Sequence, residues 1–204
     1  MKTVLLERNQ ISQAALILKK KGIVAFPTDT VYGLACLFDD KEAIEKMKEA
    51  KNRPEEKSFP LMVASFSKMA EVAYIPEEYE ELIKHFMPGA FTVILKKKDI
   101  IPDYSTGYKD TVAIRIPDDE FVISLLQECG PLLVTSANIS GKETGKNNEE
   151  VLEQLEGRIE AVVKGKALGK ASTIVDLTGE DIKILRTGEI TEEEINDWRK
   201  ENAG

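Results

Sequence analysis

The chain has 204 residues, of which 42% are hydrophobic and 31% are charged, so it can bury a sizeable core and fits one large or two small domains. Its 36 acidic and 28 basic residues give a net charge of −8. Such a field opposes non-specific attraction to polyanions and leaves any nucleic-acid role dependent on a local basic patch.

Helices are predicted where apolar residues recur at helical spacing. The first covers residues 9–21 and ends at Gly22, which suits a helix C-terminus. The second begins at Asp39, an N-cap candidate with an acidic residue three positions later, and stops before Pro54. A capping box at Thr191–Glu194 opens the last helix. The other helices are predicted over residues 77–86, 118–129 and 148–155, and the last one covers 191–200.

Strands are predicted where short apolar runs lie between turn signals. They fall at residues 23–26, 61–64, 91–95, 111–116, 132–135, 161–164, 173–177 and 182–186. Because strands alternate with helices, the pattern favours an α/β chain with a mixed sheet. No linker, low-complexity tract or solenoid repeat divides the chain, so we expect one domain over residues 1–204.

The chain carries no sign of membrane insertion or secretion. Its first apolar stretch is far too short for a signal peptide, and no run approaches the ~20 apolar residues of a membrane span. We therefore expect a soluble, cytoplasmic protein without a membrane partner.

Cysteine and histidine give no signal for a metal site or a redox motif. Cys36 and Cys129 stand alone in apolar contexts, so we expect both to be reduced, buried packing residues. His85 is the only histidine and falls in an amphipathic helix, where a structural or surface role is expected. We therefore expect no side chain of the protein to act as a metal ligand.

The predicted strand at residues 111–116 has one apolar and one polar face. Because side chains alternate along a strand, Val112, Ile114 and Ile116 point one way. Thr111 and Arg115 share the other face with the small Ala113 between them. Arg115 then either extends into solvent from an exposed face or forms the floor of an anion site.

Five short segments place cations beside small hydroxyl or amide side chains. Each lies where an apolar run ends or carries a polar face, so their polar groups can converge in one nucleotide-handling cleft. Taken singly, the serine and asparagine segments also fit ordinary turn caps. The segments are Pro27–Gly33, Lys51–Pro54, Thr111–Pro117, Thr135–Gly141 and Leu185–Gly188.

Positive charge gathers at the end of the second predicted helix. Lys51 is explained by the negative end of the helix dipole, but Arg53 and Lys57 are not. Three cations within seven residues can clamp a triphosphate, and Arg186 can add a fourth. The chain contains no Walker-type loop and no dinucleotide fingerprint, so this would be a different solution to nucleotide binding.

In this order and at these separations, the segments resemble the YrdC-type threonylcarbamoyl-AMP synthases, in the single-domain form called TsaC. The resemblance runs from about residue 11 to about residue 190 and includes Ser172–Asp176. It implies an α/β fold whose twisted, mixed, open sheet is flanked by helices and carries a concave basic ligand cleft. It also implies a nucleotidyltransferase that joins L-threonine, bicarbonate and ATP into threonylcarbamoyl-AMP and pyrophosphate. The product would feed the threonylcarbamoyladenosine modification of tRNA through a downstream transferase complex.

The resemblance also implies roles for individual residues. The catalytic group would be Lys51, Arg53, Ser136 and Asn138. ATP would contact Arg53, Lys57, Ser58, Thr111, Asn138, Lys146 and Arg186. Threonine would contact Thr30, Arg115, Ser136 and Ser172, with Arg115 gripping its carboxylate. Asp29 would contribute through water, and Mg²⁺ would arrive with ATP, coordinated chiefly by phosphate and water.

The chain departs from the family pattern in three places. Ala64 stands where one branch of the family has a histidine, and the segment from Lys51 to Pro60 is longer than in that branch. The chain ends soon after the last motif, so we expect closure by a loop of this domain, around residues 141–148.

Two other functions fit parts of the sequence. A non-catalytic RNA-binding module of YrdC type would use basic clusters such as residues 96–98, but these lack interleaved aromatic residues. Carbamoyl adenylation without threonine occurs in hydrogenase-maturation relatives, which are far longer and carry zinc-finger and acylphosphatase segments that this chain lacks.

Overall fold

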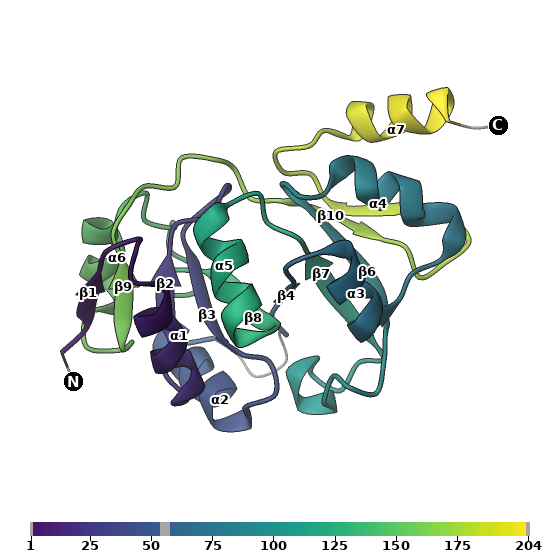
Figure 1. Ribbon diagram of the computed structural model, residues 1–204. Helices are drawn as coiled ribbons and strands as arrows, with labels where there is room; N and C mark the ends of the chain where they lie inside the picture. The colour runs from purple at the N-terminus through teal and green to yellow at the C-terminus, as the bar shows by residue number, and fades with distance from the viewer. Residues whose placement is uncertain (1, 54–57, 203–204) are drawn as a thin grey trace.

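The computed structural model describes residues 2–53 and 58–202. Its strands are β1 (Val4–Leu6), β2 (Val24–Phe26), β3 (Gly33–Leu37), β4 (Leu61–Met62), β5 (Ala73–Tyr74), β6 (Phe91–Lys97), β7 (Thr111–Arg115), β8 (Leu132–Ser136), β9 (Ala161–Val163), β10 (Thr173–Asp176) and β11 (Lys183–Arg186). Among the described residues they form one sheet in the order β1-β9-β2-β3-β8-β4-β7-β6-β10-β11, with β5 paired to β6 (Figure 1). Parallel pairs such as β4 with β7 alternate with antiparallel ones such as β6 with β7, so the sheet is mixed, and it remains open.

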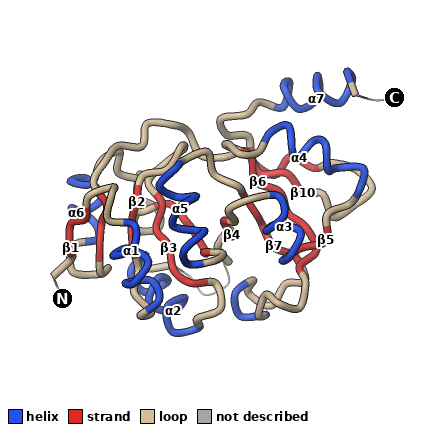
Figure 2. Tube along the Cα trace, in the orientation of Figure 1, coloured by secondary structure: helices blue, strands red, loops and turns tan. Residues whose placement is uncertain are grey.

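The helices cover this sheet in two groups. They are α1 (Ile11–Lys19), α2 (Lys41–Lys51), α3 (Phe66–Val72), α4 (Glu80–Phe86), α5 (Glu120–Cys129), α6 (Asn148–Leu155) and α7 (Glu192–Glu201), with short 3-10 turns at Glu77–Tyr79 and Asp103–Ser105. α1 and α5 pack side by side and share one apolar cluster with β2, β8 and β9 (Figures 1 and 2). α2, α3, α4, α6 and α7 contribute to the larger cluster. No helix within residues 2–53 and 58–202 is long and apolar enough to cross a membrane.

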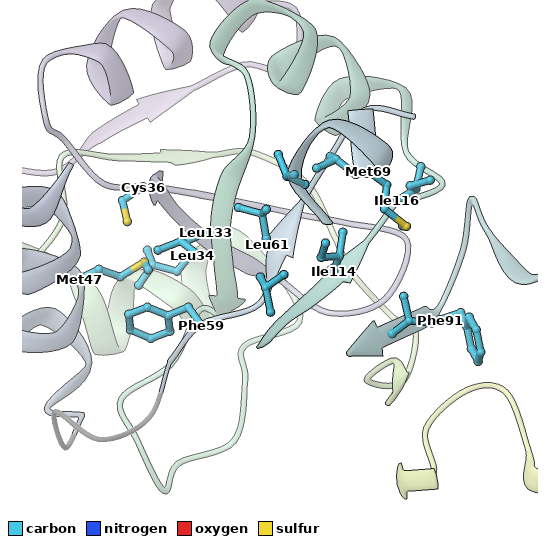
Figure 3. Packing of buried hydrophobic residues seen from close by; sticks show 14 of the residues in the cluster. Leu34, Cys36, Met47, Phe59, Leu61, Met69, Phe91, Ile114, Ile116 and Leu133 are labelled. Atoms are coloured by element: carbon cyan, nitrogen blue, oxygen red, sulfur yellow. The ribbon is translucent and has the colours of Figure 1, made fainter. Parts of the chain in front are cut away.

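The larger cluster includes side chains from β3 and β8 and also from β4, β6 and β7 (Figure 3). Leu34 of β3, Met47 of α2 and Leu61 of β4 are fully buried there, as is Ile114 of β7. Burying one such side chain contributes roughly 1.5–3 kcal/mol, which offsets the roughly 1–2 kcal/mol of backbone entropy lost in ordering that residue. The core therefore fixes the strands whose ends carry the polar segments.

One stretch of sheet has a single apolar face. Phe91, Val93 and Leu95 of β6 are buried in the core, and so are Val112 and Ile114 of β7. The other side chains of these strands point the opposite way: Ile94, Thr111 and Ala113 are half-buried, whereas Thr92 and Arg115 are buried. This confirms the alternation predicted for the strand at residues 111–116.

The predicted elements are present, most of them with shorter ends, while β6 and β8 extend beyond their predicted ends. α6 spans the predicted residues, and the capping box of α7 is formed by Thr191 and Glu194. The N-cap of α2 is Asp40, which accepts a hydrogen bond from the backbone of Ala43, and not Asp39 as predicted. Strands β1, β3 and β5 and helix α3 were not predicted.

The two cysteines differ in burial. Cys36 is fully buried in the core, as predicted, whereas Cys129 at the end of α5 is only half-buried, which corrects the prediction for that residue. Both thiols are free, and burial raises the pKa of each, that of Cys129 to about 11. Neither thiol is activated as a nucleophile at neutral pH.

Candidate functional site

Arg115 lies at the carboxyl end of β7 and is held by three groups from two separate segments. Its Nε donates a hydrogen bond to the Gly89 carbonyl at 2.8 Å, and its Nη1 donates to Thr30 Oγ1 at 2.7 Å. Its Nη2 forms an ion pair with Asp29 Oδ2 at 2.6 Å. Only 4% of the residue is exposed, so the guanidinium has one fixed orientation.

The charge around Arg115 is mixed. Burial lowers its pKa, the carboxylate of Asp29 raises it, and the positive charge of Arg186 lowers it further. The guanidinium stays protonated because the ordinary pKa of arginine is so high. The site thus combines two guanidinium groups with one carboxylate.

The loop after β2 is ordered by its own hydroxyl groups. Thr28 Oγ1 donates to the Val31 carbonyl at 2.7 Å and accepts from the backbone N–H of Thr30 at 3.1 Å. The Thr28 proton is used on Val31, so in the 3.0 Å hydroxyl pair Thr30 donates to Thr28. Thr30 Oγ1 is therefore fixed between Thr28 and Arg115.

Gly169 lies against this loop from the segment between β9 and β10. A Cβ atom at this position would lie 2.8 Å from the Asp29 carbonyl oxygen and 2.9 Å from that of Thr30. Such distances leave no space for a side chain, so the two segments meet backbone to backbone.

We expect Gly169→Ala to lower the free energy of unfolding by about 1–3 kcal/mol, because the added methyl group must displace the backbone of Asp29 and Thr30. The threonine titration should weaken with it. Urea unfolding checks the stability change, with Gly179→Ala as control, where the new Cβ would lie 3.9 Å from the nearest atom. Equal stability of the two variants would contradict this packing.

Ser172 and Arg186 extend the site toward β10 and β11. Arg186 donates to the Ser172 carbonyl from Nε at 3.1 Å and from Nη2 at 2.8 Å. The Ser172 hydroxyl forms a 2.8 Å hydrogen bond with Thr92 Oγ1. Thr92 faces Arg115, because the β6–β7 register pairs Val93 with Ile114. These residues therefore continue the surface that begins at Thr30.

Lys51 supports the turn that follows β8. The residue is 1% exposed, and its Nζ donates to the carbonyls of Ser136 and of Asn138, the latter at 2.8 Å. The backbone N–H of Ser140 donates to the Lys51 carbonyl at 2.8 Å. Burial, and secondarily the charge of Arg53, lower the pKa of Lys51 to about 7. The ammonium group faces inward, toward backbone oxygens.

The Asn138 side chain is also engaged within its loop. Its Nδ2 donates to the carbonyls of Ile139 at 2.9 Å and Lys142 at 2.8 Å. Its Oδ1 accepts from the Thr144 hydroxyl at 3.3 Å. The amide group closes the loop that carries Lys142 and Lys146.

Arg53 lies just beyond α2, at the edge of the described residues. Its guanidinium carbon is 4.8 Å from the ring centroid of Phe59, and its Nη2 donates to the Ser58 carbonyl at 3.1 Å. Burial lowers its pKa. Lys57, predicted to contact ATP, lies outside the described residues.

Strand pairing joins the two groups of residues. Gly33 of β3 pairs with Ser136 of β8, and the Ala137 N–H donates to the Tyr32 carbonyl at 2.8 Å. The loop that holds Thr30 is thus beside the turn that Lys51 supports. The structure brings together these predicted residues: Thr30, Lys51, Arg115, Ser136, Asn138, Ser172 and Arg186.

Two further predicted ATP contacts lie on other parts of the fold. Thr111 is at the opposite end of β7 from Arg115, four residues along a strand, or roughly 13 Å. Lys146 is exposed and belongs to a segment whose Asn147 bridges to Lys166. Its carbonyl accepts from Ala167, so Lys146 lies near the segment that carries Gly169.

Four neighbours of the site were missing from the predicted contact residues: Thr28, Gly89 and Thr92, together with Asp29 as a direct partner of Arg115. Thr92 had a signal, since strand alternation places it opposite the core face of β6. The contact of Gly89 is made by its carbonyl oxygen, for which the residue type gives no signal. No group of three or more His, Cys, Asp or Glu side chains able to hold a metal occurs in residues 2–53 and 58–202.

Comparison with known proteins decides the family. The model of the Sua5, YciO and YrdC proteins, described as "Telomere recombination", matches residues 16–188. The chain belongs to this family. A curated member, the threonylcarbamoyl-AMP synthase of Pyrococcus abyssi, is 39% identical over 93% of the chain. The alignment covers 57% of that protein, so the chain spans little more than half the length of this relative.

Solved structures of family members share the fold. The crystal structure of P. abyssi Sua5 complexed with L-threonine matches with a TM-score of 0.90 and 36% identity, over 97% of this chain and 60% of that one. The structure of Escherichia coli YciO matches with a TM-score of 0.85 and 28% identity, over 95% and 98% of the two chains. The twisted, open, mixed sheet flanked by helices is therefore the family fold, as predicted.

Proposed function

We propose that this chain synthesises L-threonylcarbamoyl-AMP from L-threonine, bicarbonate and ATP, releasing pyrophosphate. The observation that carries the proposal is the buried guanidinium of Arg115, fixed by Thr30, Asp29 and Gly89, in a fold that matches a family member crystallised with L-threonine. A fixed guanidinium fork suits a carboxylate, the group that every amino acid offers.

Threonine would bind along the surface from Thr30 to Ser172. Arg115 would hold the carboxylate, while the hydroxyls of Thr30, Ser136 and Ser172 would bind its polar groups. These hydroxyls belong to the loop after β2, to the last residue of β8 and to the residue just before β10. The pairing of Gly33 with Ser136 and the hydrogen bond between Ser172 and Thr92 support their meeting in one region.

ATP would bind beside this surface, with cations on both sides of its phosphates. Arg53 and Arg186 are the principal cations, with Asn138, Ser58 and Thr111 as neutral partners and Lys57 and Lys146 as further positive charge. Lys51 would act in the catalytic centre by holding the turn of Ser136 and Asn138, to whose carbonyls it donates. Mg²⁺ would enter with ATP as part of the substrate, since the described residues form no carboxylate cluster for it.

The chemistry needs no strong base at the adenylation step. The threonine amine captures carbon dioxide derived from bicarbonate and loses a proton, which gives a carbamate. A carbamate oxygen then attacks the α-phosphorus of ATP, and the bond to the pyrophosphate oxygen breaks. Both reactants are anions, so catalysis comes from positioning and from cations around the phosphate oxygens.

The product would pass to a transferase complex that modifies tRNA, so we expect the enzyme to act in the cytoplasm.

The alternative function, a non-catalytic RNA-binding module, is less well supported by the surface lysines. Among the basic clusters, Lys97 pairs with Asp103, Lys98 donates to the Ala70 carbonyl, and Lys164 pairs with Glu7. Lys97 and Lys164 are thus partly neutralised by acidic neighbours, and Lys98 is engaged by a carbonyl, which weakens any phosphate-backbone site.

Pyrophosphate release from ATP by the purified chain tests the proposal. Release that requires both threonine and bicarbonate supports it. Release with carbamoyl phosphate in the absence of threonine would instead assign the chain to carbamoyl adenylation, and no release together with tight, salt-sensitive RNA binding would assign it to the RNA module.

We expect Arg53→Ala to raise the KM for ATP about tenfold or more and to leave the threonine affinity unchanged, because one charged hydrogen bond to phosphate is lost. Steady-state pyrophosphate release measures both quantities. Arg158→Ala is the matched control, since this exposed arginine contacts the Ala50 carbonyl and Asn52 near the same helix end. An unchanged ATP dependence in Arg53→Ala would remove Arg53 from the phosphate site.

A further inference from the structure

Only one of the two carboxylate oxygens of Asp29 has a partner among the described residues. Oδ2 forms the ion pair with Arg115, whereas no hydrogen-bond partner reaches Oδ1 from the residues that the structure describes. The side chain is 14% exposed, and Oδ1 itself is buried. Leaving a buried charged oxygen without a partner is costly, so such an atom in a native fold calls for a donor.

The position of Asp29 is fixed as firmly as that of Arg115. Its backbone lies against Gly169, and its neighbour Thr30 is held by Thr28 and by the Arg115 guanidinium. The carboxylate therefore cannot turn away to solvent without breaking the 2.6 Å ion pair. A hydrogen-bond donor for Oδ1 therefore has to come from a bound molecule. That molecule would lie beside Arg115, which is proposed to hold the substrate carboxylate.

We infer that Asp29 Oδ1 binds the α-ammonium group of the amino-acid substrate, whose carboxylate is held by Arg115; the inference rests on the proposed function. In an α-amino acid the two charged groups sit on one carbon atom. A carboxylate in ion-pair contact with the guanidinium is therefore placed to receive the ammonium. The site then selects zwitterionic α-amino acids over hydroxy acids of the same shape.

The charges around the site require such an anion. The charged groups acting on Arg115 are Asp29 and Arg186. Without Asp29, an incoming ammonium would meet only the two guanidinium groups, and like charges at close range repel. With Asp29, the ammonium gains an anionic partner, and the bound site then holds three positive charges and two negative ones.

The contact also survives the first chemical step. When the ammonium loses two protons to solvent and its nitrogen bonds to carbon dioxide, the resulting carbamate nitrogen keeps one N–H. Asp29 Oδ1 can accept from that N–H as it did from the ammonium, so the same carboxylate orients the nitrogen before and after carbon dioxide capture. Asp29 acts as a substrate-binding residue throughout and exchanges no proton.

Binding of two ligands to Asp29→Asn separates this role from a structural one. The probes are L-threonine and 2,3-dihydroxybutanoate of matching configuration, in which a hydroxyl replaces the amine, each titrated by calorimetry or by competition. We expect Asp29→Asn to weaken threonine at least tenfold and to change the affinity of the hydroxy acid less than twofold. Asp118→Asn, an exposed carboxylate, is the control and should leave both affinities unchanged.

Equal losses for the two ligands would overturn the inference, since they would mean that Asp29 only orients Arg115. An unchanged threonine affinity would overturn it as well. Asp29→Glu, which restores the charge, should recover part of the threonine affinity and guards against a fold defect in the asparagine variant. The two binding titrations do not depend on catalysis. Absence of threonine-dependent pyrophosphate release would therefore contradict the proposed function without deciding how Asp29 binds the ammonium.

Discussion

Replacing Arg115 by alanine should raise the KM for threonine by about two orders of magnitude, because truncating one partner of a buried charge pair costs about 2–5 kcal/mol. The substrate carboxylate would lose the guanidinium that binds it. The Asp29 carboxylate would lose its only ion-pair partner among the described residues. The free energy of unfolding should fall as well, on the order of 3 kcal/mol, since the buried carboxylate is left uncompensated. Threonine calorimetry and urea unfolding measure the two effects.

Arg8→Ala provides the matched control for the stability change. Arg8 pairs with Asp119 at 2.8 Å, but its side chain is 42% exposed, and such pairs contribute about 0–1 kcal/mol. Arg115→Lys separates binding from folding, because lysine keeps the charge without the rigid fork of donors. A threonine titration that is the same in wild type and in Arg115→Lys would count against carboxylate recognition by the guanidinium.

The face on which Arg115 lies was predictable from sequence, but its partners were not. Alternation along residues 111–116 is a local property, and the burial of Val112 and Ile114 follows it. The hydrogen bond from Arg115 to Thr30 spans 85 residues and depends on how β4, β7 and the loop after β2 are arranged. No local pattern encodes that arrangement, so only the resemblance to a family brought the segments together.

The missed elements have local reasons. β3 begins at Gly33 and includes Ala35, both weak strand formers, and it follows its loop without a separating turn signal. It is nevertheless buried, because β2 and β8 flank it and supply its hydrogen bonds. α3 is only seven residues long, too short for a clear helical period, and it begins after the N-cap Ser65.

The position of Lys51 in the sequence does not predict where its side chain points. At the last turn of a helix, a lysine side chain can reach solvent, a ligand or the protein interior, and the helix dipole does not distinguish these directions. Only the pairing of β3 with β8 brings the carbonyls of Ser136 and Asn138 within its reach. The sequence could identify the residue as important but not what its ammonium contacts.

Lys51→Met should lower the rate of pyrophosphate release about a hundredfold, because it removes both hydrogen bonds that hold the Ser136–Asn138 turn. Methionine fills a similar volume with an unbranched chain, so the defect is confined to the two carbonyls. Each carbonyl left without a donor costs about 1–3 kcal/mol. Lys48→Met is the control, since Lys48 pairs with Glu45 at 3.0 Å on the same helix.

The stability of wild type relative to Lys51→Met should also depend on pH, with a defined sign. The pKa of Lys51 is about 7 in the folded chain against an ordinary 10.5, so between these values the unfolded chain binds more protons. The free energy of unfolding therefore rises with pH in this window, by at most ~1.4 kcal/mol per pH unit, and is flat below it. Urea unfolding of both proteins at pH 6.5, 8 and 9.5 measures the difference, and parallel curves would contradict it.

The rate of the wild-type enzyme above pH 7 distinguishes support of the turn from contact with phosphate. A neutral amine keeps two N–H groups, which is enough for the two carbonyls, so the turn stays formed after Lys51 loses its proton. We therefore expect kcat/KM for ATP to change less than twofold between pH 7 and 8.5. A tenfold fall per pH unit in this range would instead mean that the positive charge of Lys51 acts on the phosphates.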